Sequence, residues 1–215
     1  MGRARFPTTA RASDVLSLFE PDAARIQREL AARRTMDFSY PDVGATRTTA
    51  PAGWRINHMR RLVGQGRALL DALVEPLFSW KLLAVDGLRP FPDKERLEPG
   101  TSVAILSRHF GMWSLDFCRV IYVLEDEPEQ DGKIKRTGFG YGTLPGHAVR
   151  GEEIFSLEWH EATEEVWYEI RSFSKPSNVL ITLAGPLAMT AQRRFAGASL
   201  EKARRLTQSS GRPSG

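Results

Sequence analysis

Five segments rich in β-branched and aromatic residues follow one another between Ser102 and Phe173, and this succession constrains the fold more than any other feature of the chain. Short polar or glycine-bearing connections separate them, such as residues 126–132 and 160–163. Strands joined by such short links pair antiparallel, because a parallel crossover needs a dozen or more residues. The predicted strands are residues 102–108, 113–125, 135–141, 152–159 and 165–173.

Helical patterns are predicted on both sides of this β-rich region. Apolar spacing predicts a helix over residues 57–78, and residues 80–85 are predicted to form a strand. After the last strand, Pro176 fits the first turn of a helix, and Gly185–Pro186 interrupts and restarts that helix. Leu187 and Phe195 then lie on one apolar face of a long C-terminal helix.

We therefore expect an α+β fold in which a curved antiparallel sheet wraps around the long C-terminal helix. Such a sheet must bury one face, and the last helix is the expected cover. A cavity between the two layers would suit an apolar ligand. The expected organisation is an N-terminal extension with a helix over residues 1–34, a single domain over 35–207 and a polar, disordered tail over 208–215.

Composition and charge argue against several classes of function. The net charge of +4 and the pI near 9.5 come from arginines near the two ends, so we expect no nucleic-acid partner. No apolar run approaches the ~20 residues that span a bilayer. Cys118 is the only cysteine, which excludes an internal disulfide and fits a reducing cytoplasm. The histidines have no metal-ligand spacing and no cofactor motif is present, so we expect neither a metal nor a cofactor.

Residues 138–155, GFGYGTLPGHAVRGEEIF, concentrate glycines and titratable groups and form the candidate site. The glycines at 138, 140 and 142 alternate along a predicted strand, which leaves room for a ligand or for a closely packed helix. They are not a dinucleotide motif, because no strand–turn–helix follows them.

His147 lies on the predicted connection between two strands of this segment and has two interpretations. As a general base it needs a partner carboxylate, and Glu152 or Glu153 is near in sequence. As a plain loop histidine it needs none.

The adjacent glutamates must point to opposite faces if both lie in a strand. Glu153 then shares a face with Phe155, and Glu152 lies on the other face. If Phe155 faces inward, Glu153 is buried and needs a partner such as Arg150 or Tyr141. The alternative is a strand-end carboxylate in water.

Several motifs together resemble the family labelled domain of unknown function nineteen-ninety, from about residue 36 to 203. The order of elements is also similar to the helix-grip, START-like (SRPBCC) superfamily, which includes lipid carriers, hormone receptors, polyketide cyclases and aromatase components. The motifs are Tyr40-Pro-x-x-Gly44-Ala-Thr46, Asn57-His58, Val63-Gly64-x-Gly66-Arg67, Trp80, Gly138-Phe-x-Tyr141-Gly-Thr-Leu-x-Gly146-His147, Gly151-Glu-Glu-x-Phe155 and Phe173-Ser-x-Pro176.

Two functions follow from the residues and the resemblance. In the first, the protein binds a small hydrophobic molecule between the sheet and the C-terminal helix. In the second, a cofactor-independent cyclase, dehydratase or isomerase acts there on a polyketide-like or other small hydrophobic substrate. His147, Glu153 and Tyr141 are the candidate catalytic residues of the second hypothesis. The expected ligand-binding residues are Tyr141, His147, Arg150, Glu153, Tyr168 and Leu187.

Overall fold

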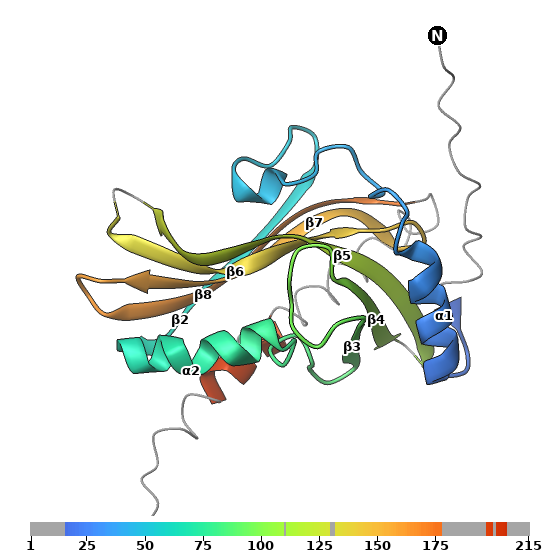
Figure 1. Ribbon diagram of the computed structural model, residues 1–215, viewed down its shortest axis with the longest axis horizontal. Coiled ribbons are helices and arrows are strands. Elements are labelled where there is room, and N and C mark those ends of the chain that lie inside the picture. The colour runs from blue at the N-terminus through green and yellow to red at the C-terminus, as the bar shows by residue number, and fades with distance from the viewer. Residues whose placement is uncertain (1–15, 110, 130–131, 178–196, 200, 206–215) are drawn as a thin grey trace, which may run out of the picture.

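A curved antiparallel sheet with helices at its surfaces makes up the structure (Figure 1). The computed structural model describes residues 16–109, 111–129, 132–177, 197–199 and 201–205. Seven strands follow one another in the order β2-β8-β7-β6-β5-β4-β3, and the short β1 pairs with β5. The strands are β1 (Leu16–Ser17), β2 (Arg55–Gln65), β3 (Leu88–Pro92), β4 (Ser102–His109), β5 (Met112–Glu129), β6 (Ile134–Thr143), β7 (Val149–His160) and β8 (Glu165–Pro176).

The α+β class, the curved sheet and the antiparallel pairing of the five predicted strands are confirmed. Those five strands are β4 to β8, and each pairs with the next along the chain. Each is longer than its pattern predicted, because pairing with a neighbour carries a strand past the last clearly apolar residue. Among the described residues, no helix is long and apolar enough to cross a membrane.

The predicted helix over residues 57–78 is wrong in its first half, which is strand β2. Helix α2 (Arg67–Phe78) begins only after Gly66. Gly64 has φ +155° and Gly66 has φ +98°, so neither can continue a right-handed helix. Because β2 is an edge strand paired only with β8, most of its side chains are exposed or half-exposed and it lacks a clear apolar alternation.

Two further predictions around the sheet are wrong. Residues 80–85 form turns rather than a strand, and Trp80 has φ +64°. Trp80, Leu82 and Leu83 are buried because the turn packs against the core, whereas Ala84 and Val85 are half-buried. Pro176 ends strand β8, opposite Val149, and does not begin a helix. Its missing N–H is tolerated because the register of the neighbouring β2 begins only at Ser174.

The inner face of the sheet, defined here as the face toward α2, holds the main core. Leu70, Leu73 and Leu77 of α2 pack against β6, β7 and β8, so α2 covers this face (Figure 1). Residues 197–199 and 201–205 are helical, and Ala203 joins the same core. The described C-terminal residues form short helical segments, and they do not show the long C-terminal helix that was predicted. Leu187 and Phe195 lie outside the described residues.

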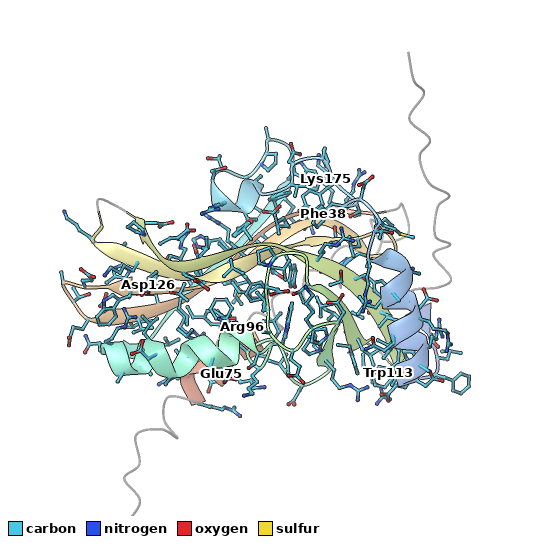
Figure 2. All side chains as sticks on the ribbon, viewed as in Figure 1. Phe38, Glu75, Arg96, Trp113, Asp126 and Lys175 are labelled. Carbon is cyan, nitrogen blue, oxygen red and sulfur yellow. The ribbon has the colours of Figure 1, made fainter. Side chains whose placement is uncertain are left out.

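The opposite face, here the outer face, carries a second layer. Helix α1 (Ala23–Arg33) buries Ile26 and Leu30 against β4 and β5. The 3-10 helix η2 (Ala45–Arg47) and its flanking loops lie over the middle of the sheet (Figure 1). Phe38 and Lys175 lie on this side, whereas Glu75 lies on the α2 side (Figure 2).

Candidate functional site

Tyr141 and Glu153 form a buried pair on the inner face. They are directly opposite each other in the register of β6 and β7, and the Tyr141 hydroxyl donates to Glu153 Oε2 at 3.0 Å. Glu153 is 9% exposed and Tyr141 is 6% exposed. The prediction that Glu153 shares the inward face with Phe155 is confirmed, and its partner is Tyr141.

Burial makes Glu153 an unusual carboxyl group. Burial raises its pKa to about 7, against the smaller opposing effect of the hydrogen bond from Tyr141. Burial, together with the charge of Glu153, also raises the pKa of Tyr141, which therefore stays a neutral phenol. Near neutral pH, Glu153 can thus exist in both its protonated and its ionised forms.

Four buried polar side-chain atoms have no hydrogen-bond partner among the described residues: Ser79 Oγ, the Trp80 indole nitrogen, Arg136 Nε and Glu153 Oε1. Trp80 and Glu153 are the two that lie beside the aromatic residues of the inner face. Trp80 packs edge-on against Phe139 with ring centroids 5.4 Å apart, and Phe139 stacks on Phe155 at 5.3 Å. One acceptor and one donor are therefore set in an aromatic wall, where unpaired polar groups are unfavourable.

Tyr168 lies on the same face and connects it to the C-terminal helical residues. Its hydroxyl lies 3.0 Å from Ser199 Oγ, which donates to the Leu82 carbonyl oxygen at 2.7 Å. Burial raises the pKa of the Tyr168 hydroxyl, so it too is neutral. Cys118 is fully buried nearby, and burial raises the pKa of its thiol, which makes it a poor nucleophile.

His147 lies in the loop between β6 and β7 and contacts Asp116 of β5. Its Nδ1 accepts a hydrogen bond from the Val149 backbone N–H at 3.1 Å and lies 3.5 Å from Asp116 Oδ1. Asp116 also accepts from the Ala148 N–H at 3.0 Å. The carboxylate beside His147 is therefore Asp116, which neither the motif nor the sequence spacing identified.

The remaining predicted ligand residues are not part of the Tyr141–Glu153 pair. Arg150 is exposed on β7, where its register partner is Lys175. Leu187 lies outside the described residues.

Glu152 is a buried and fully hydrogen-bonded carboxylate, which its sequence pattern did not indicate. It is 2% exposed on the outer face, where its Oε2 accepts from the Tyr40 hydroxyl and the Gly44 N–H, both at 2.7 Å. Its Oε1 accepts from the Thr46 N–H at 2.8 Å and from the Thr46 hydroxyl. The donors are the named residues of the motif Tyr40-Pro-x-x-Gly44-Ala-Thr46, so two separate sequence motifs form one hydrogen-bonded cluster. In the sequence, this cluster could have been indicated by the presence of both the Gly151-Glu-Glu motif and the donor-rich 40–46 loop.

The alternating glycines of β6 serve the outer face rather than a ligand or a helix. A Cβ on Gly140 would collide with the Tyr122 ring, and one on Gly142 would collide with the Tyr40 hydroxyl. A Cβ on Gly138 would collide with the backbone of β7. Gly140 and Gly142 thus leave room for the side chains of Tyr122 and Tyr40, whereas Gly138 allows the backbone of β7 to approach closely.

Comparisons with known proteins agree with the motifs. A UPF0548 protein of Deinococcus radiodurans is 35% identical over 187 residues, covering 82% of this chain and 90% of that protein. A UPF0548 protein of Arabidopsis thaliana is 38% identical over 149 residues, covering 69% and 71%. Norcoclaurine synthase from Thalictrum flavum, solved in complex with dopamine and hydroxybenzaldehyde, is 10% identical with a TM-score of 0.41, covering 78% and 94%. The family model described as domain of unknown function (DUF1990) matches residues 39–202, and the chain belongs to that family.

Proposed function

We propose that the protein binds a small, largely apolar molecule on the inner face, with one polar group of that molecule at Glu153. The supporting observation is that Glu153 Oε1 has no partner among the described residues and lies in a largely apolar wall. Buried polar atoms in native proteins nearly always have partners, so a ligand that offers a hydrogen bond here would stabilise the site. Tyr141 orients the carboxyl group from the other oxygen.

The second candidate function is acid–base catalysis without a cofactor. It is favoured by the Glu153 pKa of about 7, which lets one group give and take a proton near neutral pH. The protonated form would donate to a carbonyl or leaving hydroxyl group, and the ionised form would remove a proton from carbon. A cyclase, dehydratase or isomerase reaction on a small hydrophobic substrate needs only such transfers and a shaped apolar wall. We rank binding first, because His147 contacts Asp116 and the described contacts do not join it to Glu153.

Native mass spectrometry of the purified protein is the first test, because it detects a co-purifying molecule and gives its mass. The molecule is then titrated into wild type, Glu153→Gln and Tyr141→Phe. Loss of the Glu153 contact should weaken binding about tenfold or more, as expected for a hydrogen bond to a charged group. His147→Ala should stay within about tenfold of wild type if the protein is a carrier.

Turnover separates the two functions. An enzyme that depends on Glu153 should lose about 10²–10⁴-fold in rate in Glu153→Gln while binding persists. The same loss in His147→Ala would assign the proton transfer to the His147–Asp116 pair instead. Unchanged affinity in both Glu153→Gln and Tyr141→Phe would contradict the proposed site.

A further inference from the structure

A pocket opens on the outer face, at the end of the sheet where the β5–β6 and β7–β8 connections lie. It has a volume of about 570 Å³ and is lined by residues of β2, β5, β6, β7 and β8 and of these two connections. This volume is in the range of sites for small organic molecules. The lining residues are His58, Arg60, Glu129, Lys133, Ile134, Arg136, Glu158, His160, Ala162, Thr163 and Glu169.

The two buried carboxylates of this pocket are fully engaged by the protein. Glu158 accepts from Arg136 at 2.9 Å on Oε1 and from Arg60 at 2.7 Å on Oε2. Burial alone would raise the pKa of Glu158, but the hydrogen bonds from Arg136 and Arg60 outweigh it and lower that pKa. Glu158 is therefore an ionised group whose oxygens are both occupied.

Glu169 is engaged in the same way. Its Oε1 lies 2.8 Å from His58 Nε2, and its Oε2 lies 3.1 Å from Arg136 and 3.2 Å from the Ser156 hydroxyl. The third carboxylate, Glu129, is more exposed and contacts Arg136 at 2.7 Å. The acids of the pocket thus hold Arg136 in place, and they leave little acceptor capacity for a cationic ligand. Among the described residues, no group of His, Cys, Asp and Glu is arranged to hold a metal ion.

The groups that remain available are donors. Arg60 Nη2 lies 2.9 Å from His160 Nε2, and since an arginine only donates, that nitrogen accepts. The same nitrogen lies 3.5 Å from Glu158 Oε2. The other ring nitrogen, Nδ1, then carries a proton and is the donor that His160 can offer to a ligand. Lys133 is exposed, and its ammonium group has no ion pair within the described part of the chain.

We propose that this outer-face pocket binds a small organic anion, a carboxylate or a phosphate ester, through Lys133 and His160. Arg60 completes the donor set at the wall and is itself held over the Trp167 ring at 4.0 Å. The buried Arg136, Glu158 and Glu169 form a hydrogen-bonded floor, whose charges are balanced when Arg60 is counted with them. These contacts position the donors before an anion binds. This site is separate from the inner face and does not rest on the function proposed there.

The test is an NMR titration of the ¹⁵N-labelled protein with inorganic phosphate, acetate and glycerol 3-phosphate at constant ionic strength. Saturable shifts are expected at the amides of Lys133, His160 and Thr163. A preference for phosphate or acetate tells which anion class the pocket takes. Lys133→Met should raise the dissociation constant about tenfold, because it removes one charge-assisted hydrogen bond. His160→Phe should raise the dissociation constant as well.

Lys135→Met is the matched control, since Lys135 lies two residues away, pairs with Glu161 at 2.5 Å and does not line the pocket. Its affinity should equal that of wild type. Thermal unfolding of each variant checks that the fold is kept, which is expected because both lysines lie at the surface. Shifts that do not saturate, or that respond equally to Lys133→Met and Lys135→Met, would mean non-specific attraction and would overturn the proposal.

Discussion

At the scale of single residues, the neighbours Glu152 and Glu153 show how strand alternation gives one residue type two roles. Both are buried, on opposite faces of β7. Both oxygens of Glu152 accept from donors of the 40–46 loop, whereas Glu153 has one donor and one oxygen without a partner in the described part of the chain. A fully hydrogen-bonded carboxylate stabilises structure, and a partly satisfied one is available for function.

Glu153 should make stability depend on pH in the direction opposite to most carboxylates. Its pKa rises from 4.5 unfolded to about 7 folded, so between these values the folded state binds more protons than the unfolded state. This contribution is fully present below pH 4.5 and is lost as pH rises through 7. The free energy of unfolding of wild type minus that of Glu153→Gln should therefore fall by about 3 kcal/mol from pH 4 to pH 8.

Urea unfolding at several pH values measures this difference. Glu75→Gln is the control, because Glu75 is exposed on α2 and its carboxylate pairs with the exposed Lys81. Its difference from wild type should stay nearly constant with pH. A constant difference for Glu153→Gln would show that folding does not raise the pKa of Glu153.

At the scale of elements, Glu152 anchors the loop that contains η2 to the middle of β7. Glu152→Ala would leave the buried donors of Tyr40, Gly44 and Thr46 without an acceptor, so we expect a loss of about 3–5 kcal/mol in stability. Glu127→Ala is the matched control, since Glu127 makes an exposed ion pair with Arg47 of the same η2. It should lose less than about 1 kcal/mol in urea unfolding. Equal losses would mean that the loop is held by other contacts.

The close packing of this loop on β6 gives a second prediction at the same scale. Gly142→Ala would place a methyl group against the Tyr40 hydroxyl and should destabilise the protein by about 1–3 kcal/mol. Gly197→Ala places its methyl group in open space on a helical residue and should stabilise by up to about 1 kcal/mol. Thermal unfolding of both variants compares them directly. A neutral Gly142→Ala would show that Tyr40 can move aside.

At the scale of the whole molecule, α2 is the described cover of the inner face, in the place where the C-terminal helix was predicted. Leu73 of α2 is fully buried in the main core, so Leu73→Ala should lose about 2–5 kcal/mol in urea unfolding. Asp71 lies on the exposed side of the same helix and pairs with Arg67, so Asp71→Ala should change stability by less than about 0.5 kcal/mol. A loss under about 1 kcal/mol for Leu73→Ala would mean that α2 is not an essential cover.

Local patterns were sufficient for the five long strands and for the faces of Glu152 and Glu153, because alternation and short connections act over a few residues. Local patterns failed for β2, because its place at the edge of the sheet depends on pairing with the distant β8. They also failed for the turn around Trp80, because the burial of that turn depends on distant parts of the core. The Tyr141–Glu153 bond needed the β6–β7 register, and the Glu152 cluster needed a loop more than one hundred residues earlier in the chain. The outer-face pocket brings together side chains from five strands, and their contacts exist only after the sheet has formed. The spacing of apolar residues depends on residues close together in the sequence, whereas hydrogen-bond partners and burial depend on residues that come together only in the folded structure.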